Sequence, residues 1–312
     1  MTFPAQPKTA AGLRDGWRSR RLTNAQFGMM LVAPAAALMA WWILWLMISS
    51  VYLGFTNFSP VYSPIPEWVG LRNYRFLAQL ADFRGSWGVS LKFTTLCVVG
   101  QFLVGFGLAL VLNQGIKGQN LWRGALLAPW VVPTAAASVV VMWVFNANSG
   151  VINSILVEVG LLQRFFNFVG DPTAALFTTA GARVWKSYPF VMVVILSGLQ
   201  TVPVEQLEAA TVDGATTLQR FRYITLPHLR YTITVVLLTA FIWSFTSFQF
   251  VWIMTEGGPG RATDILPVMV YRWAFMNWRT SRAAAAGTTW LVFLLIFSIV
   301  FVRIAAGRSV DE

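Results

Sequence analysis

The sequence predicts an all-α membrane protein with six transmembrane helices, and two observations support this. Of the 312 residues, 56% are hydrophobic and only 11% are charged, whereas a soluble domain contains about 25% charged residues. Apolar runs of about 20 residues, the length that crosses a bilayer as a helix, recur along the chain. The segments between these runs mix aromatic and turn-forming residues, which indicates ordered loops.

Five of the expected spans contain no charged side chain. These five runs cover residues 29–49, 93–112, 124–145, 231–254 and 283–302. A sixth span is expected at about residues 173–204, and it is chemically unusual because it contains Arg183 and Lys186. The run at 124–145 contains Pro129 and Pro133, and we expect it to form one span.

The expected organisation is a polar, basic tail over residues 1–27, a six-helix membrane domain over 28–306 and a short tail over 307–312. The first apolar run is too long for a signal-peptide core, so we expect it to be retained. Twelve Lys and Arg residues lie on the side of the termini and eight on the other side. This bias predicts that both termini and the loop at 203–229 are cytoplasmic.

Composition also excludes several classes of function. The net charge of +11 is explained by basic residues that flank spans and face anionic lipid, so no nucleic-acid partner is expected. The chain has one cysteine, Cys97, and one histidine, His228. A disulfide framework, a histidine metal site and a Ser-His-Asp triad are therefore not expected, and we predict no catalytic or metal-binding residues.

The loop between the fourth and fifth expected spans is the most polar helix-compatible segment of the chain. Residues 205–213 can form a short helix with its acidic residues in the first turns, where the helix dipole favours them. Gly214 is a typical stop signal, a second amphipathic helix is expected at 216–224, and Pro227 is expected to end it. Two short helices of this kind form either a docking surface or an ordinary interfacial connector.

Two spans each carry a polar and aromatic face at helical spacing. The residues concerned are Arg183, Lys186, Ser187 and Phe190 in the fourth span, and Ala240, Trp243, Ser244 and Ser247 in the fifth. A charge inside a span costs about 2.5–3.5 kcal/mol on insertion scales, so it is rarely accidental. If the two faces meet, they form a pocket whose aromatic rings suit the C–H face of a sugar and whose polar groups suit its hydroxyls.

Within this expected pocket, we predict that Trp243 and Ser244 contact the bound solute, a sugar or a similar molecule. Pro189 is expected to interrupt the fourth span and free a backbone carbonyl there. These residues also allow a second interpretation. Arg183 and Lys186 can extend to the outer interface or pair with an acid of a partner subunit, and the serines can serve helix packing.

A long motif within the polar loop comprises Glu208, Ala209, Ala210, Gly214, Ile224, Leu226 and Pro227. This motif resembles the signature loop of importer permeases of the ATP-binding-cassette superfamily. The segments at 70–74, 123–133, 184–189 and 255–259 are similar to those of the carbohydrate branch, the maltose-type permeases. The resemblance covers nearly the whole chain, but the tail before Phe27 matches nothing specific.

This resemblance implies a type I importer permease fold and a docking role for the loop. Glu208 and Gly214 would carry the coupling, and Ala209 and Ala210 would let two surfaces approach closely. The sequence has no Walker A motif, so the chain is not expected to be an enzyme, and ATP and Mg would bind to separate subunits. The implied partners are a second permease subunit with a different sequence, two ATPase subunits, an extracytoplasmic solute-binding protein and membrane lipid.

The implied solute is a sugar, an oligosaccharide or a related polyol or sugar acid, and the implied location is the cytoplasmic membrane of a bacterium or archaeon. The eight pocket positions resemble the sugar site of the maltose-type permeases. Arg183 and Lys186 stand where neutral residues line that site, so its disaccharide specificity does not carry over. An acidic or phosphorylated sugar is therefore an alternative candidate for the solute.

Three other classes of protein fit the sequence less well. An ion-coupled secondary transporter usually needs carboxylates within the membrane, and the five clean spans contain no Asp or Glu. A non-transporting scaffold would not need two cations within a span. A membrane enzyme would need a catalytic cluster, which the sequence lacks.

Overall fold

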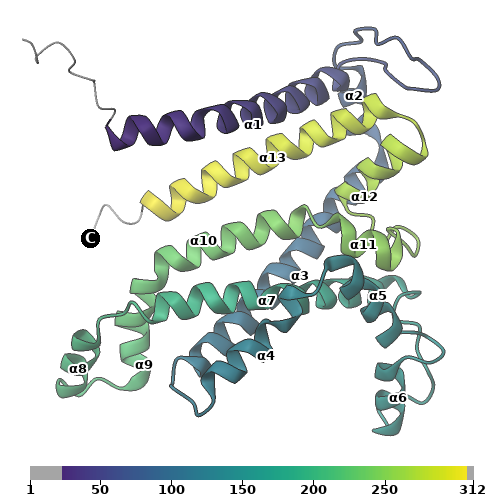
Figure 1. The fold of residues 1–312 in the computed structure, drawn as a ribbon. Coiled ribbons are helices and arrows are strands. Elements are labelled where there is room, and N and C mark those ends of the chain that lie inside the picture. The colour runs from purple at the N-terminus through teal and green to yellow at the C-terminus, as the bar shows by residue number, and fades with distance from the viewer. Residues whose placement is uncertain (1–22, 308–312) are drawn as a thin grey trace, which may run out of the picture. The chain divides into compact units, whose positions relative to one another are not determined.

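The computed structural model describes residues 23–307, and these residues form helices joined by loops (Figure 1). Two isolated β-bridges, Thr56 with Trp68 and Ser59 with Ser63, are the β contacts of this part of the chain, which has no strand. The prediction of an all-α protein is confirmed. Most of the expected tail at 1–27, and most of that at 307–312, lies outside the described residues.

The structure divides into two compact units, one up to Ser49 and one from Ser50 onward. The first unit holds most of α1 (Asn24–Gly54), which contains the expected first span. The large apolar side chains of α1 are exposed, as in a helix that faces lipid, and Trp41 stacks on Trp45 at 6.2 Å between ring centroids.

The second unit contains the remaining helices and the short π-helical turns η1 and η2. Their bounds are α2 (Arg72–Gln79), α3 (Ala81–Leu112), α4 (Gln119–Val131), α5 (Thr134–Val144), α6 (Val151–Glu158), α7 (Pro172–Leu199), α8 (Val204–Val212), α9 (Thr217–Arg220), η1 (Phe221–Thr225), α10 (Leu226–Phe245), α11 (Phe248–Thr255), α12 (Leu266–Tyr271), η2 (Arg272–Met276) and α13 (Thr280–Gly307).

Four of the described helical segments are long and apolar enough to cross a membrane. They are Phe27–Gly54, Ala81–Leu112, Thr217–Phe245 and Thr280–Ile304. Two further candidates are bent pairs: α4 with α5, which meet at 95°, and α7 with α8, which meet at 66°. If each bent pair counts as one span, the described residues contain six, as the sequence predicts.

The expected span at 124–145 is not a single helix, because α4 ends at Val131 and α5 begins at Thr134. Pro133 lacks an N–H and disfavours a helical conformation at the preceding residue, and Val132 is extended, with ψ 131°. In α7, by contrast, the helix continues through Pro189. The expected interruption there is therefore absent, although Pro189 still has no N–H to donate to the preceding turn.

The expected span at 231–254 also differs from the structure at both ends. Helix α10 ends at Phe245, and α11 starts after a break at Thr246 and Ser247. At the other end, α9, η1 and α10 run on without a loop, so Pro227 does not end a separate helix. The N–H of Leu226 donates to the carbonyl of Phe221, and this wider turn accommodates a proline inside a continuous helical segment.

Helices α3 and α7 pack along each other and form the centre of the second unit. Gly105 of α3 allows this close approach, because a Cβ there would lie 2.8 Å from the carbonyl oxygen of Tyr188 and 2.7 Å from Cβ of Val191. Small residues serve this purpose in membrane helix pairs. Buried Val191, Ile195 and other side chains of α7 continue the core toward α10.

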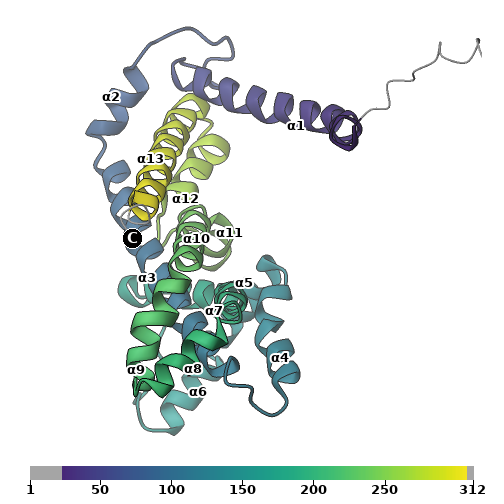
Figure 2. The same cartoon turned by 90° about the vertical axis from the view of Figure 1, so that its left-hand side faces the viewer.

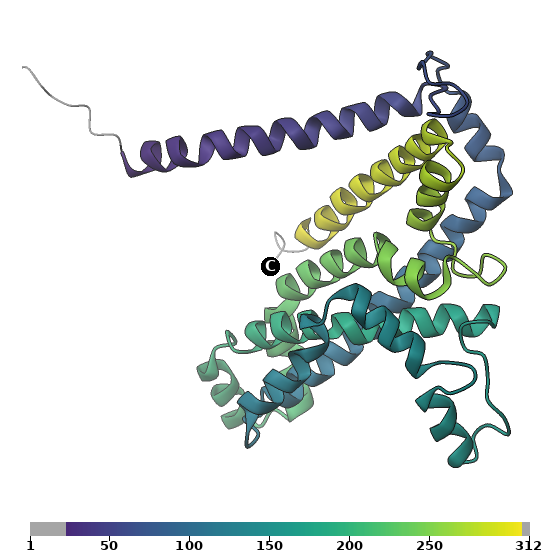
Figure 3. The same ribbon diagram turned by 45° about the vertical axis from the view of Figure 1, so that its right-hand side comes forward.

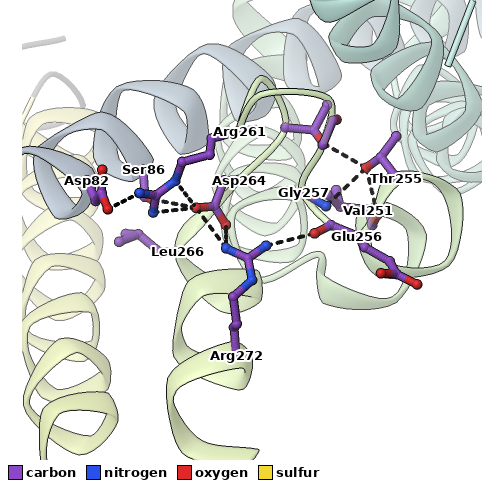
Figure 4. Close-up of polar contacts among 12 residues, drawn as sticks. Asp82, Ser86, Val251, Thr255, Glu256, Gly257, Arg261, Asp264, Leu266 and Arg272 are labelled. Carbon is purple, nitrogen blue, oxygen red and sulfur yellow. Dashed lines mark hydrogen bonds and ion pairs between the residues drawn. The ribbon is translucent and has the colours of Figure 1, made fainter. Parts of the chain in front are cut away.

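At the end of the second unit where α12 and η2 lie beside the start of α13 (Figure 3), a buried carboxylate organises the connection between α11 and α12. Asp264 is fully buried, and its Oδ2 accepts hydrogen bonds from Arg261 Nη2 at 2.7 Å and Nε at 2.9 Å. Its Oδ1 accepts from Arg272 Nη1 at 3.2 Å, and Ser86 of α3 donates to Oδ2 at 3.4 Å (Figure 4).

This network joins three segments of the chain. Arg261 also forms an ion pair with Asp82 at the start of α3, and Arg272 Nη2 donates to the carbonyl of Glu256 at 2.8 Å. Burial lowers the pKa of Arg261, but the hydrogen bond and charge of Asp264, followed by those of Asp82, outweigh it and raise that pKa. The network therefore fixes the loop after α11 against α3.

Asp264→Asn is expected to lower the free energy of unfolding by about 3 kcal/mol, because it leaves two arginines around a neutral side chain in a buried site. Asp82→Asn is the matched control: its side chain is 55% exposed, and a surface ion pair contributes about 1 kcal/mol or less. Thermal unfolding of both variants in the same detergent checks the difference. Equal destabilisation by the two changes would contradict the central role of Asp264.

Candidate functional site

A cavity of about 560 Å³ lies where two broken helical segments meet α7. The end of α4 and the start of α5 form one wall, α7 forms the second, and the break between α10 and α11 forms the third. Its lining residues are Trp130, Thr134, Arg183, Lys186, Ser187, Phe190, Trp243, Thr246, Ser247, Phe248, Gln249 and Phe250. The volume is in the range typical of small-molecule sites.

Three aromatic rings from three helices follow one another along the cavity. The ring centroids of Phe190 and Trp243 are 4.7 Å apart with an interplanar angle of 51°, and those of Trp130 and Phe190 are 6.2 Å apart. Trp243 is 43% exposed, so part of its ring is free for a ligand. Such surfaces suit apolar C–H groups, while the hydroxyl and amide groups around them can bind polar substituents.

Both cations of α7 bind backbone carbonyls at helix ends. Lys186 Nζ donates to the carbonyl oxygen of Trp130 at 2.7 Å, near the end of α4. Arg183 Nη2 donates to the carbonyl oxygen of Trp243 at 3.4 Å, near the end of α10. Carbonyls in the last turn of a helix lack intrahelical donors and carry the negative end of the dipole, so each break provides an acceptor for one cation.

The cavity has an excess of positive charge, because neither Asp nor Glu is among its lining residues. Lys186 is 8% exposed, and no ion pair involves either cation among the described residues. The remaining N–H groups of Arg183 and Lys186 can therefore donate to hydroxyls or to an anionic group of a ligand.

Six of the eight residues predicted to face this pocket do line it: Arg183, Lys186, Ser187, Phe190, Trp243 and Ser247. The other two, Ala240 and Ser244, are buried and do not line the cavity. Gln101 Nε2 of α3 donates to Ser244 Oγ at 3.2 Å. Ser244 therefore has a partner within the protein and lies outside this cavity, and its contact with the solute stays a prediction.

Sequence reasoning missed the lining residues that the helix breaks supply. Trp130 and Thr134 flank the bend at Pro133, and Thr246 and Gln249 flank the break after α10. The proline was a usable signal, since a proline inside an apolar run marks a site where the helix can break. The second break occurs at a Thr-Ser pair within an apolar run, which gave a much weaker signal.

The predicted docking loop forms two short helices that lie beside each other at the far end of α7 and α10 (Figure 1 and Figure 2). Gly214 follows α8 with φ +81°, a conformation that favours glycine. Ala215 N donates to the carbonyl of Ala210 at 2.8 Å, and Gly214 N donates to that of Thr211 at 3.1 Å. This pair of bonds is the Schellman arrangement, which satisfies the last carbonyls of a helix.

The next turn is also organised by local hydrogen bonds. Thr216 and Gln219 form a capping box at the start of α9, which satisfies two free N–H groups. Arg220 Nη1 donates to Thr211 Oγ1 at 2.7 Å, so α9 is tied to α8. The loop therefore holds its shape through its own hydrogen bonds.

The motif residues of this loop lie mostly at its surface. Glu208, Ala209, Gly214, Leu226 and Pro227 are exposed, and Ala210 and Ile224 are partly buried. Large apolar side chains beside them are also exposed, with Val212 at 89%, Leu218 at 73% and Tyr223 at 71%. Exposed apolar surface next to charged residues is typical of an interaction site.

One helical segment connects the loop to the cavity. It runs through α9, η1 and α10 from Thr217 to Phe245, and Trp243 in its last turn lines the cavity. Phe221 in η1 also contacts Phe106 of α3, with ring centroids 6.2 Å apart. No group of His, Cys, Asp and Glu among the residues that the structure describes is arranged to hold a metal ion.

Comparison with known proteins agrees with this architecture. The family model described as the inner membrane component of binding-protein-dependent transport systems matches residues 101–310. The trehalose/maltose transport system permease protein of Thermococcus litoralis is 29% identical over 91% of this chain and 95% of its own length. The diacetylchitobiose uptake system permease protein of Streptomyces coelicolor is 31% identical over 98% and 95%, respectively.

The fold also matches a solved structure. A chain of a bacterial ABC transporter involved in the import of the acidic polysaccharide alginate superposes with a TM-score of 0.75 and 20% identity, over 93% of this chain and 100% of that chain. Because the two sequences are only 20% identical, this match shows a similar fold and nothing more. The family match covers most of the chain, so this protein belongs to the inner membrane components of binding-protein-dependent transport systems, the permease subunits of ABC importers.

Proposed function

We propose that this permease imports a carbohydrate and that the cavity between α4, α5, α7, α10 and α11 is its solute site. The main support is that the cavity combines the rings of Phe190 and Trp243 with the hydrogen-bond donors of Arg183 and Lys186 at two helix breaks. The solute class includes sugars, oligosaccharides, related polyols and sugar acids. Relatives named for trehalose/maltose, diacetylchitobiose and maltodextrin transport support this class.

The chemistry of the cavity suits such a solute. The rings of Trp243 and Phe190 suit the C–H face of a sugar, and the hydroxyl, amide, ammonium and guanidinium groups nearby suit its oxygen atoms. Arg183 and Lys186 add positive charge without a lining carboxylate, which favours a solute that carries an acidic group.

In this proposal the energy comes from two separate ATPase subunits that bind ATP and Mg. The loop at 203–229 would dock on one of them, with Glu208 and Gly214 at the contact and Ala209 and Ala210 allowing close approach. The exposed apolar side chains of Val212 and Leu218 suit burial in such an interface. The chain itself has no Walker A sequence, and we propose that it has no ATPase activity of its own.

The continuous segment from Thr217 to Phe245 supports an alternating-access mechanism. Closure of the ATPases would move the docked loop, and a rigid helix would carry that motion to Trp243 at the cavity. A second permease subunit with a different sequence would complete the pathway. A solute-binding protein would deliver the solute outside, and both termini would be cytoplasmic, as the distribution of Lys and Arg indicates.

Trp243→Ala removes a partly exposed ring of the cavity and is expected to raise the KM for uptake about tenfold, which corresponds to about 1.4 kcal/mol of binding. Uptake by the complete transporter in proteoliposomes, supplied with its binding protein, measures this. Trp122→Ala is the control, because Trp122 is 52% exposed and is not among the residues that line the cavity. An unchanged KM and unchanged solute preference would contradict a solute contact for Trp243.

Arg183→Gln removes one positive charge from the cavity, and it is expected to lower uptake of acidic sugars about tenfold relative to neutral ones. The physical reason is the loss of a charge-assisted hydrogen bond to an anion in a partly dehydrated site. Arg183→Lys keeps the charge and is expected to retain most of the preference. If Arg183→Gln reduces transport of acidic and neutral sugars to the same extent, Arg183 does not select for charge.

Glu208→Lys reverses the charge of an exposed side chain on the docking loop, and it is expected to abolish ATP-coupled uptake while membrane insertion stays normal. Repulsion or a steric conflict at the ATPase contact is the cause, and co-purification of the ATPase with the permease measures it. Glu158→Lys at the end of α6 makes the same charge change on another exposed site and is expected to have no effect. Normal uptake by Glu208→Lys would overturn the docking role of the loop.

A further inference from the structure

A second hollow, of about 300 Å³, is lined by residues of the loop at 57–63, α2 and the start of α13. These segments lie at the end of the second unit opposite the docking loop (Figure 3). Three arginines line it: Arg72, Arg279 and Arg282. No Asp or Glu is among the lining residues. The transport function described above does not use this hollow.

The three arginines have no carboxylate partner in the described part of the chain, where the ion pairs involve Arg261 and Arg272. The acidic residues nearby have other partners. Glu67 accepts a hydrogen bond from Asn57 at 3.1 Å. Asp82, which lines an adjacent hollow with Arg279 and Arg282, forms its ion pair with Arg261. The local charge is therefore strongly positive.

Helix geometry adds to this charge. Arg72 is the first residue of α2, Arg279 directly precedes α13, and Arg282 lies in the first turn of α13. The N-terminal end of a helix is the positive end of its dipole, where an acidic residue is favoured and a cation is not. Three arginines at two such ends are unfavourable, and an anion bound among them would offset that cost.

Aromatic rings hold two of these guanidinium groups in place. The guanidinium carbon of Arg279 lies 4.5 Å from the ring centroid of Tyr62, and that of Arg282 lies 4.0 Å from the ring centroid of Phe76. A guanidinium held over a ring face keeps its N–H groups free to donate. That arrangement suits bidentate binding of a phosphate.

The hollow lies beside the point where an apolar, span-length run begins, which is where the lipid headgroups of a bilayer would lie. The apolar run of α13 begins at residue 283, directly after Arg282. Asn73 of α2 donates to the carbonyl of Gly54, the last residue of α1, so the hollow also lies at the end of that apolar helix. Tyr62 is 62% exposed and Trp278 46%, and aromatic side chains of this kind are enriched at the membrane interface.

We propose that Arg72, Arg279 and Arg282 bind the phosphate of an anionic phospholipid in the outer leaflet of the membrane. The choice of leaflet rests on the orientation proposed above, in which both termini are cytoplasmic. The positive charge selects an anion, and the position at the ends of two apolar helices brings the phosphate layer of the bilayer to the hollow. The bound headgroup offsets the repulsion among the arginines and ties α2 to the start of α13.

The test uses the complete transporter in nanodiscs of phosphatidylcholine alone or of phosphatidylcholine with phosphatidylglycerol. Phosphatidylglycerol is expected to raise the melting temperature of the wild-type transporter and to remain bound in native mass spectrometry. The double variant Arg279→Gln/Arg282→Gln is expected to lose this stabilisation and to bind the lipid about tenfold more weakly. Arg84→Gln, which changes an exposed arginine outside this hollow, is expected to behave as wild type.

A charge-preserving variant guards against a general folding defect. Arg279→Lys/Arg282→Lys is expected to retain part of the lipid effect, because lysine keeps the charge but not the bidentate geometry. Equal lipid binding by the wild type and the Gln double variant would overturn the proposal. So would stabilisation by inorganic phosphate alone in phosphatidylcholine nanodiscs, which indicates a soluble anion, or a defect confined to docking of the solute-binding protein, which indicates a protein partner.

Discussion

The hydrogen bond from Lys186 Nζ to the carbonyl of Trp130 illustrates the constraint on which this structure depends. Inside a bilayer, a free backbone carbonyl and a buried cation are each costly. The bend at Pro133 leaves the last carbonyls of α4 without helical donors, and α7 supplies a cation that binds one of them. Arg183 and the end of α10 repeat the arrangement. The charges and the breaks therefore compensate each other and create a polar cavity within an apolar protein.

One continuous helical segment, from Thr217 to Phe245, reaches from the predicted docking loop to the cavity and contains a proline, Pro227. A loop after Pro227 would separate the two sites mechanically. The π-helical turn at η1 instead lets the chain pass the proline while Leu226 bonds to Phe221, so the helical segment stays continuous as far as Phe245. Hydrogen bonds from the turn at Gly214 to the capping box at Thr216 hold the loop in shape, so a displacement of the loop on the proposed docking would move the whole helical segment.

The sequence predicted much of this architecture because its main signals are local. Apolar runs identify spans, and Gly214 with its neighbours identifies a helix stop. The direction in which Ser244 points depends instead on Gln101, a distant residue of α3, and helical spacing alone cannot reveal that partner. The break after α10 has no proline to mark it, and α11, which follows the break, packs against α5, α7 and α12. Only the structure therefore reveals that Thr246 and Gln249 line the cavity.

Three groups of arginine and lysine side chains in the described residues differ in how their charge is balanced, and that difference supports the different roles proposed for them. Arg261 and Arg272 are paired with the buried carboxylate of Asp264, so their charge is balanced within the protein. In the cavity each cation binds one backbone carbonyl, which leaves unbalanced charge and free N–H donors at the proposed solute site. The hollow near Arg282 has no acidic side chain in its lining to balance the charge of its arginines. An unbalanced positive charge at a boundary with lipid attracts a counter-charge, and the anionic headgroups of a bilayer would supply it.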